Sequence, residues 1–303
     1  MAVFVQMARL EASALSYHGG KTPMVIAKEG IHMAVRIEKA GSVWTVIHDR
    51  PEARNAMDPE SADALTAALL EFDANKDASV AVLYGAGGAF CAGWDLKYVS
   101  TLDADYPLGE LDISTARPRG NGGEIPRGPL GPSRLELDKP VIAAVEGPAV
   151  AGGMELALWC DFRVMAKDSY FGVYCRRWGV PLIDGGTVRL PRIVGQGRAL
   201  EIILTGRKVP AEECLQIGLC EYLTPKDGAR EKAEELARDI ARFPQVCVRA
   251  DRRSAIRSHG LPVREALIQE WYNGREALIV DGVAGASRFK DGLGRHGDFA
   301  KIR

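Results

Sequence analysis

The sequence lacks an excess of charge of either sign, since 39 Lys and Arg residues face 40 Asp and Glu residues over 303 positions. Without a global field the chain has no general attraction to nucleic acid or acidic membranes, so any polyanion must meet a local cluster. No apolar run approaches the length of a membrane span. Six cysteines are scattered without a C-x-x-C pair, which argues against a zinc site or a disulfide framework. These absences predict a soluble, cytoplasmic protein with reduced thiols.

Several catalytic and nucleotide-binding motifs are also missing. GAGGAF (85–90) has Phe90 where the third glycine of a dinucleotide-binding loop belongs, and GGKT (19–22) lacks the earlier glycine of a P-loop. No G-x-S-x-G nucleophile elbow is present. None of the five histidines lies near the glycine-rich turns in sequence, which disfavours Ser-His and Cys-His mechanisms. Carboxylates and backbone amides remain as the candidate chemical groups.

Hydrophobic periodicity predicts an α/β protein. Residues 33–49 alternate around a glycine-containing turn, which indicates a β-hairpin. Asp58 and Pro59 provide an N-cap and a first helical position for a helix that runs to about Phe72. Further strands are predicted at VAVLYGA (80–86), VIAAVEG (141–147), FRVMA (162–166) and YFGV (170–173). From about Ala211 the pattern becomes helical throughout, and strands that alternate with helices are typical of the α/β class.

The pattern divides the chain into an extension, a core and a helical region. Residues 1–32 lack the basic start and long apolar centre of a secretory signal, so we expect a flexible N-terminal extension. The core is predicted over 33–225 and the helical C-terminal region over 226–303. Within the core, residues 101–135 are rich in Pro and Gly without sustained periodicity. A long loop of this kind inside a compact domain is more often a functional lid than a linker.

Two strand-to-glycine turns carry the clearest chemical signal, GAGGAFCAGWDLK (85–97) and VEGPAVAGGMELA (145–157). In the second turn, Gly152 and Gly153 fall at the start of a predicted helix, where backbone N–H groups have no intrahelical partner and negative charge is favoured. Glycine lets a ligand approach the backbone closely, so a carbonyl oxygen that becomes an enolate would be stabilised there. The alternative is that these glycines only permit tight packing of a helix on a strand.

The two turns, together with three further stretches, resemble the crotonase (enoyl-CoA hydratase/isomerase) superfamily. The matching stretches, in the order and spacing of that family, are RPEARNAMD (50–58), GAFCAGWDLK (88–97), GPAVAGGMELALWCD (147–161), FGVYCRRWGVPLIDGGTVRLPRIVG (171–195) and LTGRKVPAEECLQIGLCEYL (204–223). The resemblance covers about residues 33–300. It implies an α/β core of repeated ββα units wound into a superhelix, with a helical C-terminal trimerisation region and assembly as a trimer or a hexamer.

The resemblance also implies which residues hold the substrate. In that family two backbone amides bind the thioester oxygen of an acyl-CoA, and here they fall on Trp94 and Gly152. Coenzyme A is then part of the substrate, and no separate cofactor and no metal are expected. The positions that line the CoA channel in relatives are Ala53, Arg54, Ala92, Asp95, Leu96 and Lys97.

Glu155 matches one of the two catalytic glutamates of the hydratases, although an acid in the first turn of a helix also stabilises the helix dipole. The second glutamate is missing, because Cys175 stands at its position after Phe171-Gly172. We expect Arg176 and Arg177 to be near enough to pair with Glu155, which would lower its pKa.

Asp184 is the best available substitute for the missing glutamate, because isomerase branches of the family carry an acid at or near this place. The alternative is that Asp184 caps a helix that starts near Gly185. Cys175 is a poor candidate nucleophile, since no histidine is evident to activate it.

Hydration of a 2-enoyl-CoA is therefore the favoured activity, with Glu155 as general acid/base. Double-bond isomerisation that uses Asp184, a member that binds acyl-CoA without catalysis, and thioester hydrolysis remain as alternatives. The basic stretch RADRRSAIR (249–257) is either a solvated helical face or a contact for the CoA phosphates.

Overall fold

The computed structural model describes residues 34–102, 111 and 127–294. The predicted extension at 1–32 and most of the predicted lid at 101–135 lie outside these residues, and the predicted domain boundaries stay predictions. The strands are β1 (Val35–Ala40), β2 (Val43–His48), β3 (Val80–Gly85), β4 (Val141–Val145), β5 (Pro148–Val150), β6 (Phe162–Ala166), β7 (Tyr170–Gly172), β8 (Lys208–Pro210) and β9 (Tyr222–Thr224).

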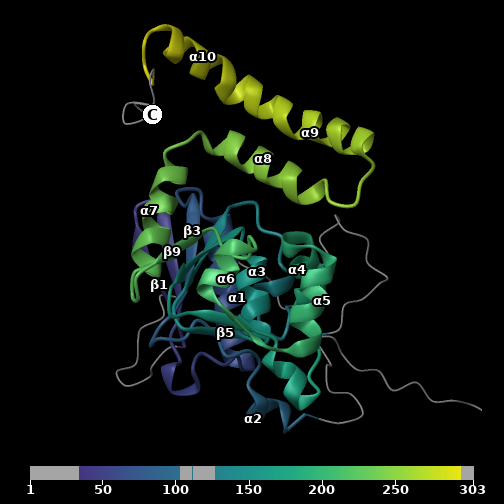
Figure 1. Cartoon of the computed structure of the whole chain (residues 1–303). Helices are drawn as coiled ribbons and strands as arrows, with labels where there is room; N and C mark the ends of the chain where they lie inside the picture. Colours follow the sequence, from purple (N-terminus) through teal and green to yellow (C-terminus); the bar gives the residue numbers. More distant parts are fainter. Residues whose placement is uncertain (1–33, 103–110, 112–126, 295–303) are drawn as a thin grey trace, which may run out of the picture. The chain divides into compact units, whose positions relative to one another are not determined.

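Helices of several kinds connect and follow these strands (Figure 1). The α-helices are α1 (Pro59–Ala74), α2 (Leu96–Val99), α3 (Gly152–Trp159), α4 (Gly186–Val194), α5 (Gln196–Thr205), α6 (Ala211–Gln216), α7 (Ala229–Ala241), α8 (Gln245–Arg257), α9 (Val263–Ala277) and α10 (Val283–Lys290). The 3₁₀ helices are η1 (Pro51–Ala53), η3 (Pro132–Arg134) and η4 (Tyr174–Trp178), and η5 (Leu278–Gly282) is a π-helical turn. No helix in the described part of the chain is both long and apolar enough to cross a membrane.

The larger sheet has the order β1-β2-β3-β4-β6-β9 in the described ranges. β1 and β2 pair antiparallel as the predicted hairpin, and the other neighbours pair parallel. β2 and β4 are buried along their whole length. The continuous Val, Ile and Ala run of β4 fits this burial, because parallel strands covered on both faces lose the alternation of polar and apolar residues. The predicted α/β class is confirmed.

Helices cover both faces of this sheet. On one face, α1 contributes Leu65, Leu69 and Phe72 to the main apolar cluster. Asp58 caps this helix by accepting a hydrogen bond from the Ser61 N–H at 2.9 Å, as the sequence indicated. On the other face, α7 packs its small side chains on alternate residues of β3 and β4. The two layers fix the carboxyl ends of the parallel strands, from which the glycine-rich turns emerge.

One expectation about the chain after Ala211 was wrong, because the helical pattern is interrupted by the strand β9. Tyr222, Leu223 and Thr224 pair with Val164 to Ala166 of β6 at the edge of the sheet. Aromatic and β-branched residues favour an extended backbone, and β6 offers unpaired backbone groups that a short strand satisfies. The tertiary partner therefore overrides the helical pattern on either side.

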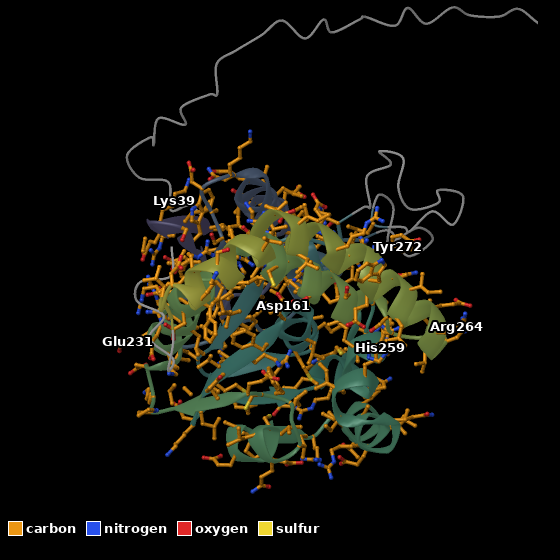
Figure 2. All side chains as sticks on the ribbon, turned by 90° about the horizontal axis from the view of Figure 1, so that it is seen from above. Lys39, Asp161, Glu231, His259, Arg264 and Tyr272 are labelled. Atoms are coloured by element: carbon orange, nitrogen blue, oxygen red, sulfur yellow. The ribbon has the colours of Figure 1, made fainter. Side chains whose placement is uncertain are left out.

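The C-terminal helices are tied to the core by arginines of α8. Arg252 binds the Asp161 carboxylate at 2.8 Å and the Leu137 carbonyl, and Arg253 binds Asp138 at 2.9 Å. Figure 2 looks onto these helices, with Asp161 near the centre of the view and Tyr272 on α9. The predicted basic helix thus directs two of its arginines to acids of the same chain. Large apolar side chains are exposed on α9 and α10, including Leu267, Ile268, Trp271, Val283 and Phe289.

His48 is buried at the end of β2 without a hydrogen-bond partner for either ring nitrogen in the described structure. Its neighbour in the sheet is Gly85, at the start of the first glycine-rich turn, so a histidine does lie beside that turn despite the distance in sequence. Burial lowers the pKa of His48 to about 4, and the charge of Arg50 adds to this effect. The ring is therefore neutral in the folded protein at neutral pH.

We expect the stability of the protein to fall between pH 6.5 and pH 4 in a way that depends on His48. The unfolded chain binds the proton near the ordinary pKa of 6.5, whereas the folded chain binds it near 4, so acid favours unfolding. The contribution is about 3 kcal/mol once both states are protonated. Urea unfolding across this pH range should show a smaller loss for His48→Leu than for the wild type. Equal losses would contradict a buried neutral His48.

Candidate active site

The two glycine-rich turns meet through direct backbone contacts. Cys91 forms a parallel bridge with Ala149 of β5, and the Val150 N–H donates to the Cys91 carbonyl at 3.0 Å. A Cβ at Gly153 would lie 2.0 Å from that same carbonyl oxygen, and a Cβ at Gly93 would lie 3.1 Å from the Gly152 nitrogen. Glycine is thus required on both sides for the first turn to reach the beginning of α3. The packing interpretation of these glycines is therefore correct, and it also brings two amides together.

The amides of Trp94 and Gly152 border the resulting pocket without an acceptor among the described residues. Met57 holds the chain on either side of Trp94, since its N–H donates to the Gly93 carbonyl and its carbonyl accepts from the Asp95 N–H, both at 2.8 Å. Gly152 follows Ala151, whose φ of 54° is strained for a residue with a Cβ. This bend turns the first amides of α3 out of the strand direction. Both N–H groups are available to an anion.

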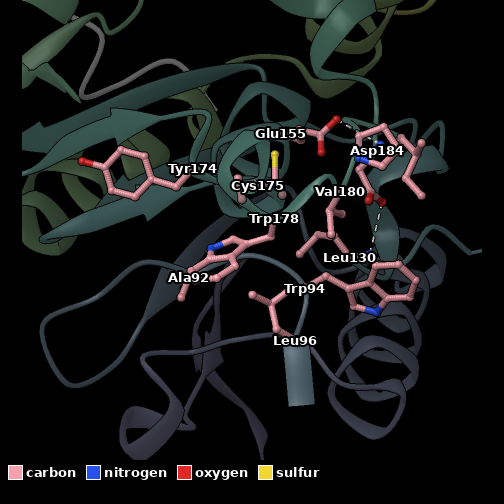
Figure 3. Close-up of a pocket in the computed structure, with 14 residues that line it drawn as sticks. Ala92, Trp94, Leu96, Leu130, Glu155, Tyr174, Cys175, Trp178, Val180 and Asp184 are labelled. Atoms are coloured by element: carbon pink, nitrogen blue, oxygen red, sulfur yellow. Dashed lines mark hydrogen bonds between the residues drawn. The ribbon is translucent and has the colours of Figure 1, made fainter. Parts of the chain in front are cut away.

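The pocket around these amides has apolar and aromatic walls and an acidic end (Figure 3). It draws on the first turn, α3, η4 and the loop before α4. Trp178 lies at its opening and is 69% exposed. The lining residues are Ala92, Trp94, Leu96, Leu130, Ala151, Gly152, Glu155, Tyr174, Cys175, Trp178, Val180, Pro181, Ile183 and Asp184. Most of these walls offer no hydrogen bond, so polar recognition falls to the two amides and the two acids.

Glu155 lies in the first turn of α3, as predicted, and is only 2% exposed. One carboxylate oxygen, Oε1, accepts hydrogen bonds from the backbone N–H groups of Asp184 at 3.0 Å and Gly186 at 2.7 Å. The second oxygen has no hydrogen-bond partner in the described part of the chain. Burial, reinforced by the negative charge of Asp184, raises the pKa of Glu155 to about 8. Two backbone hydrogen bonds thus hold one oxygen of Glu155, and the other oxygen is available in the pocket.

Asp184 is the second buried acid, also 2% exposed. It does not cap α4, since the N-cap residue is Gly185 and no side chain bonds the first turn. Instead its Oδ1 accepts from the Leu130 N–H at 3.1 Å and from the Ser133 hydroxyl. Burial raises the pKa of Asp184, against the effect of these two hydrogen bonds. The capping alternative is therefore wrong, and Asp184 stands next to Glu155 with one oxygen fixed in the same manner.

The expected pairing of Arg176 and Arg177 with Glu155 does not occur. The Arg176 guanidinium donates to the Ile203 carbonyl at 3.3 Å, and that of Arg177 stacks over the Tyr174 ring at 4.0 Å. Both leave the pocket because the 3₁₀ turn η4 directs only Cys175 toward Glu155. Burial and the Glu155 charge raise the pKa of the Cys175 thiol, so this group stays neutral and is a poor nucleophile.

The residues expected along a CoA channel divide into two groups. Ala92 and Leu96 line the pocket, and Leu96 begins α2. The other four do not line it: Ala53, Arg54, Asp95 and Lys97. Asp95 instead accepts hydrogen bonds from Arg50 at 2.8 Å and from the Lys97 N–H at 2.9 Å, which fixes the start of α2. The role of these positions in binding CoA stays a prediction.

Several site residues were not found by sequence reasoning, above all Leu130, Ser133 and Arg189. The stretch from Gly128 to Ser133 was assigned to the predicted lid, yet in the structure it is a tight buried turn closed by mutual hydrogen bonds of Gly128 and Gly131. The dense Gly and Pro content of GPLGP (128–132) is a turn signal that was available. Its contact with Asp184, 51 residues later, was not.

Known proteins are similar to this chain in sequence and in fold. The model of a family described as enoyl-CoA hydratase/isomerase matches residues 38–108 and 133–268. Enoyl-CoA hydratase EchA19 of Mycobacterium tuberculosis is 35% identical over 252 residues, which cover 81% of this chain and 88% of that protein. The (E)-benzylidenesuccinyl-CoA hydratase of Thauera aromatica is 32% identical over 237 residues, covering 78% and 87%. The crystal structure of enoyl-CoA hydratase EchA1 from Mycobacterium marinum matches with a TM-score of 0.76 at 32% identity, over 86% of this chain and 96% of that chain.

We expect Gly153→Ala to destabilise the protein by about 3 kcal/mol, since its Cβ would press on backbone that cannot move without separating the two turns. Gly197→Ala in α5 is the matched control, because nothing lies within 4 Å of a Cβ there. Alanine should stabilise that helix by about 0.5 kcal/mol. Urea unfolding of both variants measures the difference. A Gly153→Ala protein as stable as the wild type would contradict the close contact with Cys91.

Proposed function

This chain belongs to the enoyl-CoA hydratase/isomerase family, which confirms the resemblance and the crotonase-type α/β fold, and we propose that it adds water to a 2-enoyl-CoA. The observation that carries the proposal is the pair of buried acids beside two backbone amides that have no acceptor among the described residues. Glu155 and Asp184 each have one oxygen fixed and one open to the pocket. Addition of water needs a base and an acid on the two reacting carbons, and an electrophilic site for the thioester oxygen.

In the proposed mechanism the thioester oxygen lies between the N–H groups of Trp94 and Gly152. When water attacks the β-carbon, an electron pair moves through the conjugated system to this oxygen and forms an enolate. Amides that already point at the oxygen stabilise this charge without reorganisation, and removal of one such donor typically costs about 3–4 kcal/mol of transition-state stabilisation. The strained backbone at Ala151 supports this role, because strain of this kind is retained where function requires it.

Glu155 and Asp184 carry one proton between them at neutral pH in this proposal. The ionised member removes a proton from water while the hydroxyl bonds to the β-carbon. The protonated member then gives its proton to the α-carbon, which collapses the enolate to the 3-hydroxyacyl thioester. Two acids that are buried side by side cannot both ionise easily, and the raised pKa of each supports a shared proton.

Double-bond isomerisation is the second candidate, and the position of Asp184 favours it. The acid stands before α4 rather than at position 175, as in the isomerase branches that the resemblance suggested. Isomerisation moves a proton between the α- and γ-carbons through a dienolate, which the same two amides would stabilise, and consumes no water. The two reactions can therefore use the same amides and acids, and differ in whether water adds to the β-carbon and in which carbon receives the proton.

The proposal includes the remaining expectations. The protein works in the cytoplasm without a separate cofactor, because coenzyme A arrives with the substrate. It assembles as a homotrimer or hexamer, which the exposed apolar side chains of α9 and α10 support. The CoA phosphates meet basic residues locally, since the net charge of the chain is only −1.

We expect Glu155→Gln and Asp184→Asn each to reduce kcat by at least about 100-fold, the usual contribution of positioned proton transfer. Each amide oxygen still accepts the backbone hydrogen bonds, so the fold should persist. The assay is mass spectrometry of 2-enoyl-CoA and 3-enoyl-CoA thioesters in D₂O, where water addition identifies a hydratase and a shifted double bond identifies an isomerase.

The matched control is Glu146→Gln. Glu146 is also buried and accepts hydrogen bonds from two backbone N–H groups, those of Asp227 at 3.1 Å and Ala229 at 2.7 Å, but it lies outside the pocket. Its kcat should match the wild type. Unchanged turnover in Glu155→Gln would remove Glu155 from the mechanism, and thioesters that bind but return unchanged from the wild-type protein would leave only acyl-CoA binding.

A further inference from the structure

Arg189 of α4 connects the two segments that hold the acids. Its guanidinium donates one hydrogen bond to the Asp184 carbonyl and one to the Ser133 carbonyl, both at 2.8 Å. The side chain is partly buried, and a Cβ at Gly185 would collide with its Nη1 atom at 2.0 Å. No described carboxylate forms an ion pair with it. A partly buried guanidinium that binds two backbone carbonyls and no carboxylate has a role other than charge pairing.

We infer that Arg189 is a positioning residue for the Glu155–Asp184 pair, which holds the backbone segments that bind both acids and adds a positive charge that favours their ionised form. This inference rests on the proposed function of the pair. It concerns a residue that contacts neither carboxylate directly and acts through the segments that carry them.

The positional part follows from the order of the hydrogen bonds. Arg189 fixes the Asp184 carbonyl, while the N–H of Asp184 holds Glu155 Oε1. Through the Ser133 carbonyl it also fixes the turn whose Ser133 hydroxyl and Leu130 N–H hold Asp184 Oδ1. The Arg189 side chain therefore fixes both the N–H group that holds Glu155 and the turn that holds Asp184. The fixed fork of a guanidinium can bind the two carbonyls at once, whereas a lysine ammonium has no such geometry.

The electrostatic part follows from burial. Two acids in an apolar pocket resist ionisation, and a cation within the same low-dielectric region favours the ionised form. Arg189 acts electrostatically on both Glu155 and Asp184, and Arg134 also favours the ionised form of Asp184. The other charged or titratable groups around the three residues are Arg134, Arg192, Cys91, Cys160 and Cys175. The thiols stay neutral where burial raises their pKa, and Arg192 is exposed, so its charge is screened by water.

The test compares the pH dependence of kcat/KM for Arg189→Met, Arg189→Lys and Arg192→Met, the last a matched loss of charge three residues along the same helix. Loss of the partly buried cation disfavours the ionised carboxylates, so both limbs of the Arg189→Met profile should move to higher pH by about 1 unit. Arg189→Lys keeps the positive charge but loses the planar guanidinium that binds the two carbonyls at once. It should retain the wild-type limbs while kcat falls about 10-fold, with KM unchanged. Arg192→Met should match the wild type in both respects.

A second readout separates this inference from the proposed function and does not need turnover. Infrared titration follows the C=O band of the protonated carboxyl groups, and the band that disappears in Glu155→Gln and Asp184→Asn belongs to the pair. In Arg189→Met this band should persist to higher pH than in the wild type.

If Arg189→Met folds and titrates with the wild-type midpoint, the inference is overturned whether or not the protein hydrates any thioester. If the band shifts while no thioester reacts, the proposed function fails and the positioning role stands. Should Arg189→Met not fold, Arg189→Lys decides: wild-type kcat and KM in that variant overturn the positional role.

Discussion

The structure of the site depends on one backbone contact, the approach of Gly153 to the carbonyl of Cys91. Nothing larger than a hydrogen fits between them, since a Cβ would lie 2.0 Å from the oxygen. This contact draws the first glycine-rich turn onto the start of α3 and places the Trp94 amide beside that of Gly152. The left-handed backbone of Ala151 is the accompanying constraint, because the chain must leave β5 and begin a helix within one residue. The parallel sheet, with its helices on both faces, holds the two turns firmly enough to sustain this strain.

Desolvation is the second determinant, and it acts on the acids. Among residues 34–102, 111 and 127–294, no cation forms an ion pair with either carboxylate. Backbone N–H groups or a hydroxyl orient each carboxylate instead. The pKa of each acid stays raised because the effect of burial exceeds that of these hydrogen bonds. A direct arginine partner at Glu155 would have fixed the carboxylate in its charged form and made it a poor acid. Arg176 and Arg177 of η4 do not pair with Glu155, because Arg176 binds a backbone carbonyl and Arg177 stacks on a tyrosine ring.

Much of the fold and part of the site could be predicted from the sequence. The hairpin, the cap at Asp58 and the helix start at Gly152 depend on residues within a few positions of each other, so local patterns suffice. β9 could not be found in this way, because the edge of β6 that it completes lies about 58 residues earlier in sequence. Ser133 and Arg189 were missed for the same reason. Their partners across the pocket are set by tertiary packing, and the Gly and Pro signal at 128–132 indicated a turn without saying what it would contact.

The cysteine at position 175 and the aspartate at position 184 are best understood together. Cys175 is buried beside Glu155, and a glutamate in its place would bring a third acid into a pocket that already holds two. Three buried carboxylates would raise each other's pKa further, against the opposing charges of Arg134 and Arg189, and would disfavour an ionised base near neutral pH. A neutral thiol removes that repulsion. The second acid then enters from the loop before α4, where Ser133, Leu130 and Arg189 are placed to hold it. With a thiol in η4 and an acid in the loop before α4, the pocket holds two carboxylates, and the proposed addition of water uses two.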